Sequence, residues 1–258
     1  MPANSDISRA VVVGFGRMGR IHARALDALG YRVETVDPVA PDADHADIMA
    51  VAPQGIAAVA VAVPIPLLHA TAMHALEWLA PRALLVEKPG GMDAVDIERT
   101  ATLAALKGCR IAIGYTERHN PAAVALADDL AARRRAPVRA MVAARYSPHA
   151  AHEPAVPHAL DMAVHDIDLW RRLAPGASFG WQGGYAPHAM RVITCLHADG
   201  GTSVLDMARH MLDGRVYELP GDAVTREWRA LLADDYNGGN MRHEADVVLR
   251  ARGMVRDD

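Results

Sequence analysis

The sequence is poor in aromatic residues, in cysteine and in lysine, and it carries no large excess of charge. Aromatic side chains make up 5% of the 258 residues, which argues against a platform for stacking nucleic-acid bases. The formal net charge is −4, so the composition does not favour a nucleic-acid partner. The two cysteines, Cys109 and Cys195, stand in apolar segments, and we expect buried, reduced thiols in a cytoplasmic protein.

Long hydrophobic runs are missing as well. Residues 1–6 are polar and lack the basic and apolar pattern of a signal peptide. The longest apolar stretch, residues 55–68, is interrupted by Pro64 and Pro66 and is too short to span a bilayer. We therefore expect no interaction with a membrane.

Lysine is the rarer of the two strongly basic residues. Of the 27 lysine and arginine residues, only Lys88 and Lys107 are lysine. Lys88 follows the apolar run 84–86 and therefore stands at the carboxyl end of a predicted buried strand, where α/β proteins bind ligands. Lysine can lose its proton when it is desolvated, whereas arginine effectively cannot. Lys88 is thus a candidate for proton chemistry, and the alternative is a surface lysine without a role.

The first half of the chain alternates between strand-like and helix-like segments. Continuous apolar strands joined by helices are typical of a parallel sheet that is covered on both faces. The predicted strands are 10–14, 31–37, 56–63, 83–87 and 109–115, and the predicted helices are 18–29, 67–79 and 94–106. We assign residues 1–117 to this first domain.

The pattern changes near residue 117, and we assign residues 118–258 to a second, α+β domain. Its predicted helices are 121–134 and 159–173, and its predicted strands are 138–146, 179–185, 189–197, 202–209 and 215–219. Short turns between the last four strands predict a meander of antiparallel strands. Residues 236–258 have weak periodicity and are expected to form a loosely held tail.

A glycine pattern, G-x-G-x-x-G, follows the first predicted strand and opens the first predicted helix. This context is the one in which a helix N-terminus holds the pyrophosphate of a dinucleotide. Asp37 follows 18 residues after the last glycine, where an acid holds the ribose hydroxyls, so NAD is favoured over NADP. The alternative is a glycine turn in another α/β protein. The loop residues expected to contact the cofactor are Gly14, Phe15, Gly16, Arg17, Met18 and Gly19.

Two further features accompany this pattern. Pro64 ends the third strand in a loop that should lie over the cofactor, and His69 follows it, although a plain surface histidine is the simpler interpretation of His69. In the second domain, Asp161 and His165 are spaced i, i+4 on a predicted helix and share one face. A carboxylate one turn away can orient an imidazole for proton transfer to or from an alcohol. The alternative is a surface ion pair on an amphipathic helix.

Together these segments resemble the Gfo/Idh/MocA oxidoreductases. The resemblance rests on E-K-P at residues 87–89, on the glycine pattern and Pro64 before it, and on D-x-x-x-H at 161–165 after it. Residues 114–122 are similar to the family's G-x-x-x-R-F-N-P-A segment, with His119 in place of its phenylalanine, and 165–169 are similar to its H-D-I-D-L form.

The resemblance implies a Rossmann NAD-binding domain followed by an α+β domain with an open, mainly antiparallel and shortened sheet. It implies that Lys88 contacts the reacting hydroxyl, that His165 acts as general acid/base, and that Asp161 positions His165 or the substrate. Glu87 and Lys88 would also contact the cofactor. The other residues that it implies for the substrate are Tyr115, Arg118, His119 and His158.

The function that follows is an NAD(P)-dependent dehydrogenase that interconverts a secondary alcohol and a ketone on a sugar, cyclitol or sugar nucleotide. The resemblance also implies a homodimer or homotetramer formed through the C-terminal sheet. Two alternatives remain: an imine or C=C reductase, and a dinucleotide-binding regulatory protein without turnover. The loop that holds His149, His152, Glu153 and His158 lacks compact ligand spacing, so we expect no metal there and assign it to substrate contact.

Overall fold

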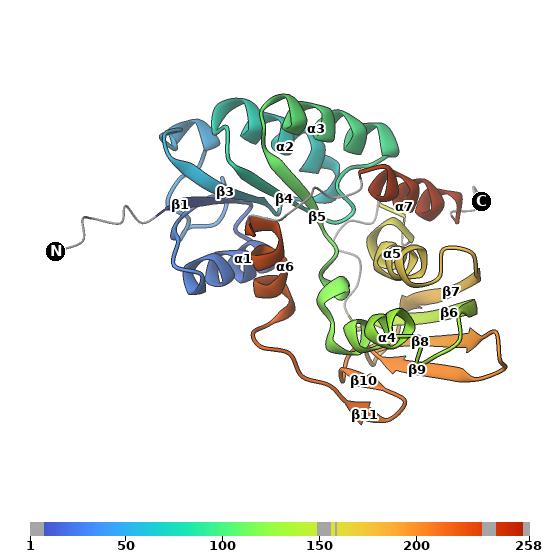
Figure 1. Cartoon of the computed structure of the whole chain (residues 1–258). Coiled ribbons are helices and arrows are strands. Elements are labelled where there is room, and N and C mark those ends of the chain that lie inside the picture. Colours follow the sequence, from blue (N-terminus) through green and yellow to red (C-terminus); the bar gives the residue numbers. More distant parts are fainter. Residues whose placement is uncertain (1–7, 149–155, 158, 234–240, 255–258) are drawn as a thin grey trace. The chain divides into compact units, whose positions relative to one another are not determined.

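The computed structural model describes residues 8–148, 156–157, 159–233 and 241–254 (Figure 1). The chain forms two compact units. The first consists of the described residues of Met1–Gly114 and Val224–Ala245, and the second of those of Tyr115–Ala223 and Asp246–Asp258. Each unit is described by itself below.

A five-stranded parallel sheet forms the centre of the first unit. Its strands are β1 (Arg9–Val13), β2 (Arg32–Val36), β3 (Ile56–Val61), β4 (Ala83–Glu87) and β5 (Arg110–Gly114), in the order β2-β1-β3-β4-β5. Every pair of neighbours is parallel, so the carboxyl ends of all five strands lie at one edge. The chain order reverses between β1 and β3, which is where open α/β sheets bind ligands. The parallel sheet predicted from the sequence is confirmed.

Helices cover both faces of this sheet. They are α1 (Arg17–Ala28), α2 (Leu68–Trp78), α3 (Ala94–Leu106) and α6 (Ala223–Leu232), with short 3₁₀ turns at Ile48–Ala50 and Ile65–Leu67. Figure 1 shows α2 and α3 on one face and α1 and α6 on the other. Local sequence sets the bounds of these helices: the side chain of Asp93 caps α3 by accepting the Asp96 N–H, and Gly30 with φ +85° follows α1.

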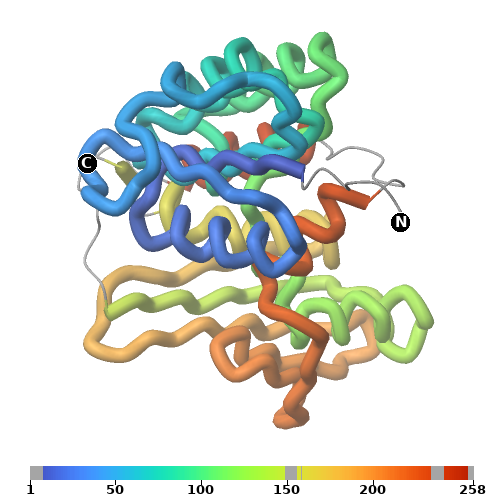
Figure 2. Tube along the Cα trace, turned by 90° about the vertical axis from the view of Figure 1, so that its left-hand side faces the viewer, coloured from blue at the N-terminus to red at the C-terminus, as the bar shows by residue number. Residues whose placement is uncertain are grey.

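Helix α6 was not expected from the sequence. Val224, Trp228 and Leu231 lie on one side of it and pack with apolar residues of α1 and the sheet, such as Leu26 and Leu85. Figure 2 shows the chain running from strand β11 (Arg215–Val216) back to α6, so this unit is built from two separate parts of the sequence.

The second unit contains a six-stranded mixed sheet. Its strands are β6 (Val138–Ser147), β7 (Ser178–Tyr185), β8 (Met190–His197), β9 (Thr202–Asp206), β10 (Met211–Leu212) and β11 (Arg215–Val216), in the order β11-β10-β9-β8-β6-β7. The prediction that β7 and β8 are neighbours in an antiparallel meander was wrong. Strand β6 lies between them and pairs with β7 in parallel, because the chain crosses over through a helix before it enters β7. The other pairs are antiparallel, so the sheet is mainly antiparallel, as expected.

One face of this sheet is covered by helices α4 (Pro121–Ala131) and α5 (Val164–Leu173). A 3₁₀ turn, Thr116–His119, precedes α4, and a π-helical turn, Ala159–Ala163, precedes α5. The core between them contains Leu126 and Leu169 of the helices and Met141, Ile193 and Leu205 of the strands. On the opposite face of the sheet, Val142 and Val204 are 55% and 43% exposed.

The expectation of a loosely held tail at residues 236–258 was wrong for the described part of that stretch. Residues Met241–Gly253 form helix α7, in which Val247, Val248 and Ala251 are fully buried. Asp246 of this helix pairs with Arg171 of α5 at 2.8 Å. Val247, Val248 and Ala251 are spaced i, i+1 and i+4, so their burial gives the helix an apolar side that was not recognised in the sequence.

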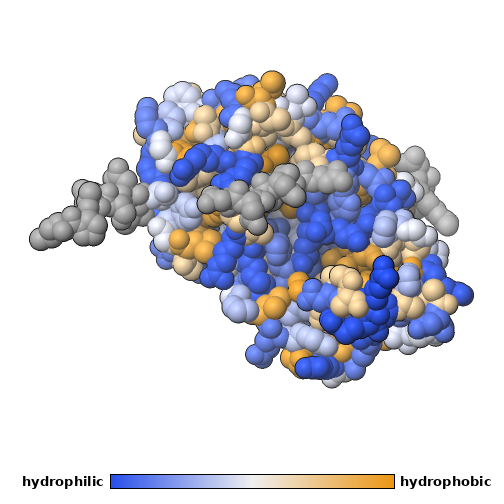
Figure 3. Space-filling view, viewed as in Figure 1, coloured by the Kyte–Doolittle hydropathy of each residue, from blue (hydrophilic) through white to orange (hydrophobic). Residues whose placement is uncertain are grey.

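None of the helices in the described ranges is both long and apolar enough to cross a membrane. On the face of the molecule shown in Figure 3, hydrophilic side chains predominate and apolar ones are scattered among them.

Candidate active site

The glycine loop of the first unit connects β1 to α1, and two of its glycines are required by close packing. Gly14 has φ +91°, and a Cβ on it would lie 2.5 Å from the carbonyl oxygen of Ala62, which follows β3. A Cβ on Gly19 would lie 1.8 Å from the carbonyl oxygen of Gly14. Both glycines therefore allow α1 to begin directly against the strands, as the motif requires.

Gly16 differs from these two glycines. It is the N-cap residue of α1, with φ −74° and ψ −157°, a conformation that any residue can adopt. Among the residues that the structure describes, no heavy atom lies within 4 Å of a Cβ placed on Gly16. Neither backbone strain nor crowding within the protein explains a glycine here. The missing side chain leaves open space in front of the first N–H groups of α1, which is a fit for the pyrophosphate of a dinucleotide.

Asp37 stands at the carboxyl end of β2, beside the glycine loop. Its Oδ2 accepts the N–H of Phe15 at 2.7 Å, and its Oδ1 accepts those of Val39 and Ala40 at 2.8 and 2.9 Å. Partial burial by itself would raise the pKa of Asp37, but these three N–H groups and the charge of Arg20 hold it below its usual value. An ionised carboxylate is therefore fixed next to the loop.

Arg20 is a neighbour of this loop that the sequence analysis missed. Its guanidinium lies 4.3 Å from the centroid of the Phe15 ring and makes two hydrogen bonds to Asp42, at 2.6 and 2.7 Å. The two positive side chains of the loop region, Arg17 and Arg20, are exposed. The spacing of Arg20 one helical turn after Gly16 was the available signal, because it places the side chain on the outer side of the first turn.

Pro64 and His69 follow β3. The carbonyl of Pro64 accepts the N–H of Leu67 at 2.8 Å and closes the short turn before α2. The Nδ1 of His69 is 2.9 Å from the hydroxyl of Thr100, and its Nε2 is 3.9 Å from Asp96, so this imidazole ties α2 to α3.

Lys88 follows β4 directly, at the same sheet edge as the glycine loop. The N–H of Gly90 donates to the carbonyl of Glu87 at 2.9 Å and closes a tight turn around Lys88 and Pro89, whose peptide bond is cis. Glu87 is buried, with 6% of its surface exposed, and its Oε2 accepts the backbone N–H of Lys88 at 3.1 Å. Lys88 itself is half-buried. The turn and the carboxylate together fix the backbone from which the Lys88 side chain starts.

In the second unit, the π-helical turn and the first turn of α5 carry Asp161 and His165, which are both half-buried. The ring of Tyr115 meets the imidazole of His165 edge to face, with centroids 6.0 Å apart and planes at 81°. Burial and the charge of Asp161 both raise the pKa of Tyr185, at the end of β7. Tyr185 thus lies within electrostatic reach of Asp161 and was not identified from the sequence.

Arg118 is held within the same unit. Its Nε and one terminal nitrogen make hydrogen bonds of 2.8 and 2.6 Å to the carboxylate of Asp168, which is fully buried on α5. Its guanidinium also lies 4.8 Å from the centroid of the Tyr115 ring. The structure therefore brings Tyr115, Arg118 and His165 together. His119 is half-buried in the 3₁₀ turn Thr116–His119, while His158, His149, His152 and Glu153 lie outside the described residues.

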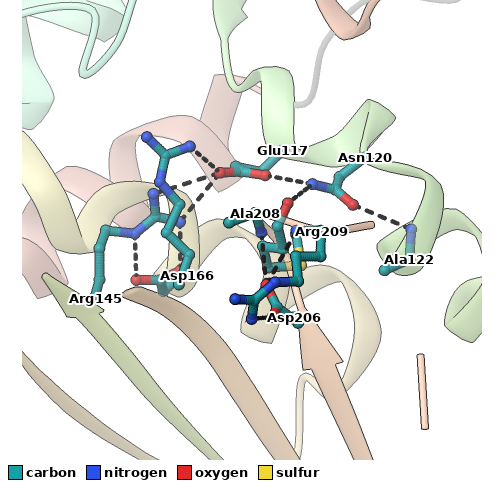
Figure 4. Close-up of polar contacts among 10 residues, drawn as sticks. Glu117, Asn120, Ala122, Arg145, Asp166, Asp206, Ala208 and Arg209 are labelled. Carbon is teal, nitrogen blue, oxygen red and sulfur yellow. Dashed lines mark hydrogen bonds and ion pairs between the residues drawn. The ribbon is translucent and has the colours of Figure 1, made fainter. Parts of the chain in front are cut away.

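A buried ionic network supports the helix that bears His165. Arg145 of β6 makes two hydrogen bonds to Asp166, at 2.9 and 2.8 Å, and lies 3.4 Å from Glu117 (Figure 4). Burial alone would lower the pKa of Arg145, but Asp166 and Glu117 raise it, so it stays charged. The indole of Trp181 donates to Asp166 at 3.0 Å, and Asn120 donates to Glu117 at 3.0 Å.

This network fixes the first turn of α5 from both sides. Asp166 directly follows His165, so the strands that hold the Asp166 carboxylate also limit rotation of α5 about its axis. One signal for this network is present in the sequence. Arg145 is spaced two and four residues from Ala143 and Met141, which places a charge on the buried face of a predicted strand, where it needs a partner.

Comparison with models of protein families and with curated proteins finds no match for this sequence. Comparison with solved structures does find matches. UDP-N-acetylglucosamine 3-dehydrogenase GnnA from Acidithiobacillus ferrooxidans is 18% identical, with 95% of each chain covered and a TM-score of 0.81. The myo-inositol 2-dehydrogenase from Lactobacillus plantarum is 14% identical, with 96% of each chain covered and a TM-score of 0.78.

A levoglucosan dehydrogenase in complex with NADH is also similar. It is 14% identical, with 96% of this chain and 95% of that chain covered and a TM-score of 0.78. At these identities the likeness concerns the fold, and it extends over both units of the chain. The chain shares the fold of dehydrogenases of the Gfo/Idh/MocA type, which confirms the fold expected from its motifs.

Proposed function

We propose that the protein is an NAD-dependent dehydrogenase that interconverts a secondary alcohol and a ketone on a sugar, cyclitol or sugar nucleotide. The observation that carries this proposal is the position of Lys88. One of only two lysines in the chain directly follows β4, two strands from the glycine loop that follows β1, at the same edge of one parallel sheet. Neighbouring strands are about 4.8 Å apart, so the two features lie within the length of a dinucleotide.

The residues around the glycine loop support NAD over NADP. The open space at Gly16 would take the pyrophosphate, and the ionised carboxylate of Asp37 would accept hydrogen bonds from ribose hydroxyls. The same charge would repel a 2′-phosphate. Arg17 and Arg20 are exposed near this loop, but Arg20 is already paired with Asp42.

When bound, the nicotinamide supplies the acceptor or donor of the hydride. The protein then has to handle the proton of the alcohol. The ammonium group of Lys88 would bind the reacting hydroxyl and stabilise negative charge on its oxygen, and His165 would take the proton from it or return it. Asp161 would orient His165 or the substrate. Oxidation removes one hydride from carbon and one proton from oxygen, so these roles complete the reaction.

The solved structures support this class of substrate. The similar proteins named above are dehydrogenases of a sugar nucleotide, a cyclitol and an anhydrosugar, and the last was solved with NADH. Two of the implied substrate residues, Tyr115 and Arg118, are in contact with each other next to His165. Tyr115 is fully buried, so its ring supports Arg118 and His165 and does not itself offer a surface to a sugar ring.

A spectrophotometric panel tests the proposal. Purified protein is mixed with NAD⁺ or NADP⁺ and with inositols, free hexoses and sugar nucleotides, and the absorbance of the reduced nicotinamide is followed. We expect turnover with NAD⁺ on at least one class and weaker turnover with NADP⁺. No turnover on any class, in a protein that still binds NADH, would overturn the proposal and favour an imine or C=C reductase or a regulatory role.

We also propose that the open face of the second sheet joins two or four copies of the chain. Val142 and Val204 are exposed there, and Val192 and Leu196 are half-buried on the same face. Light scattering should give a dimer or tetramer for the native protein and a smaller species for Val142→Lys. Val39→Lys, at a position that is 85% exposed in the first unit, should not change the mass.

We also propose that the protein resides in the cytoplasm, where a reducing environment keeps cysteine thiols free. Both cysteines are free and buried, and burial raises the pKa of each thiol to about 12, so neither is reactive at neutral pH.

A further inference from the structure

A chain of three buried side chains connects the backbone of Lys88 to helix α6. Glu87 is its first member and uses both carboxylate oxygens. Oε2 accepts the backbone N–H of Lys88 at 3.1 Å, and Oε1 lies 2.9 Å from Nε2 of His22 on α1. A Cβ on Gly114 of β5 would lie 3.4 Å from the Glu87 carboxyl group, so the neighbouring strand limits its movement. The direction of the carboxylate is therefore fixed from two sides.

His22 is the second member, and it is fully buried. Its Nδ1 accepts a hydrogen bond from the indole Nε1 of Trp228 at 3.1 Å. Because an indole N–H can only donate, Nδ1 must present its lone pair, and the ring proton is assigned to Nε2. Nε2–H then donates to Glu87. A proton on Nδ1 would face the indole N–H, so this arrangement keeps one tautomer of the imidazole.

Trp228 is the third member and the largest fully buried side chain of the described residues. It belongs to α6, which follows the second sheet in the sequence and returns to the first unit, and its ring meets His22 edge to face at 6.0 Å. Packing alone would be served by phenylalanine or leucine at this position. The indole N–H has a specific use only as the donor that selects the tautomer of His22.

We propose that His22 and Trp228 are positioning residues for Lys88, acting through the carboxylate of Glu87. The inference rests on the proposed function, in which Lys88 contacts the reacting hydroxyl. Trp228 fixes the proton of His22 on Nε2, His22 fixes Glu87, and Glu87 holds the N–H of Lys88 in the tight turn that follows β4. Helix α6, which lies far from Lys88 in the sequence, thereby sets the backbone position from which the Lys88 side chain starts.

The small number of lysines makes Lys88 directly observable. Reductive methylation with ¹³C-formaldehyde labels the chain terminus, Lys88 and Lys107, and the variants Lys88→Arg and Lys107→Arg assign the two lysine signals. Lys107 is exposed and serves as an internal reference. In the native protein we expect the half-buried Lys88 to give a signal separate from that of Lys107.

Trp228→Phe is the test variant, because it keeps an aromatic ring and removes only the indole N–H. Trp78→Phe is its matched control, since the Trp78 indole donates to the carbonyl of Val51, away from Glu87. We expect Trp228→Phe to move the Lys88 signal toward the position of an exposed lysine and to leave Lys107 unchanged. Trp78→Phe should move neither. A Lys88 signal that stays in place in Trp228→Phe would overturn the proposal.

His22→Gln gives a second line of evidence if Trp228→Phe does not fold. The amide of glutamine can donate to Glu87 in place of Nε2–H, so this variant should keep the Lys88 signal closer to that of the native protein than His22→Leu does. Equal signals in the two His22 variants would contradict a role for this hydrogen bond.

Kinetics on a substrate identified in the panel separates this proposal from the proposed function. Trp228→Phe should lower kcat by about tenfold or more, the effect of a misplaced catalytic group, and should change the Kd for NADH by a smaller factor than it changes kcat. A kcat equal to that of the native enzyme would overturn the positioning role. If instead Lys88→Ala turns over normally, the proposed function fails, while the Lys88 signal still reports whether the three side chains position Lys88.

Discussion

Replacement of Gly16 by alanine should separate cofactor binding from stability. A methyl group at Gly16 meets no heavy atom of the described residues within 4 Å, and the backbone conformation suits any residue. The remaining effect on stability comes from alanine being a poorer N-cap residue, which lowers the free energy of unfolding by about 1 kcal/mol or less. In a chain of this size, that lowers Tm by about 2–4 °C. The methyl group would, however, occupy the space in front of α1 that we assign to the pyrophosphate.

Two other glycines provide the comparison. A methyl group at Gly19 would lie 1.8 Å from the carbonyl oxygen of Gly14, so Gly19→Ala should destabilise the fold by about 3 kcal/mol or more. Gly30 has φ +85° and open surroundings, so Gly30→Ala should cost about 1–2 kcal/mol through backbone strain alone.

The assay combines urea denaturation with titration of NADH fluorescence. We expect Gly16→Ala to weaken NADH binding at least about tenfold, or 1.4 kcal/mol, at nearly native stability. Gly30→Ala should show the reverse, with native affinity and reduced stability. Native affinity in Gly16→Ala would refute the assignment of the pyrophosphate to the N-terminus of α1.

Three further predictions concern the charged residues. Asp166→Asn removes the main counter-charge of the buried Arg145 and should lower the free energy of unfolding by about 3–5 kcal/mol, measured by urea denaturation. A loss below about 1 kcal/mol would show that the ion pair is not needed for stability. Asp37→Ser should raise the affinity for NADP relative to NAD, measured by titration of both cofactors, and an unchanged ratio would remove Asp37 from the ribose site. The pKa of Asp37 is lowered as described above, and that of Asp129 is lowered by hydrogen bonds from Arg134 and Arg135. The contribution of both carboxylates to stability is therefore complete above about pH 5 and is lost as the pH falls through the folded values. Denaturation curves at pH 3 to 7 should show this loss, and stability that rises on acidification would contradict it.

Local patterns were sufficient to predict the first sheet and its glycine loop. Strands β3 and β4 are buried along their whole length, β1 is buried from its second residue on, and each of the three is followed by a helix, as the parallel fold requires. The predicted bounds of β4 and α3 were those of the structure, because Asp93 caps the helix.

The second unit shows where local patterns are insufficient. The alternation in β7 predicts a strand but not its neighbour, and the pairing with β6 depends on the crossover through α5. Helix α6 was missed because Val224, Trp228 and Leu231 find their apolar partners in strands and in a helix about 200 residues earlier. Pairings at such separations leave little trace in a short window of sequence.

The residues of the candidate site also divide into those that local patterns predict and those that depend on contacts between distant segments. Gly14, Gly19 and Lys88 could be found because each stands at a fixed offset from a strand end. Arg145 and Tyr185 could not, because their importance depends on Asp166 and Asp161, to which the fold brings them. His22 offered an intermediate signal. It follows Gly19 by one helical turn and so lies on the buried face of α1, where a histidine requires hydrogen-bond partners.

The two lysines allow the most direct test of the account. On the substrate that gives turnover with NAD⁺, kcat/KM is compared among the native protein, Lys88→Ala and Lys107→Ala, and the Kd for NADH is measured for each. We predict that Lys88→Ala loses turnover by a factor of about 100 or more while it still binds NADH, and that Lys107→Ala is unchanged. A kcat/KM in Lys88→Ala equal to that of Lys107→Ala would contradict the proposed reaction.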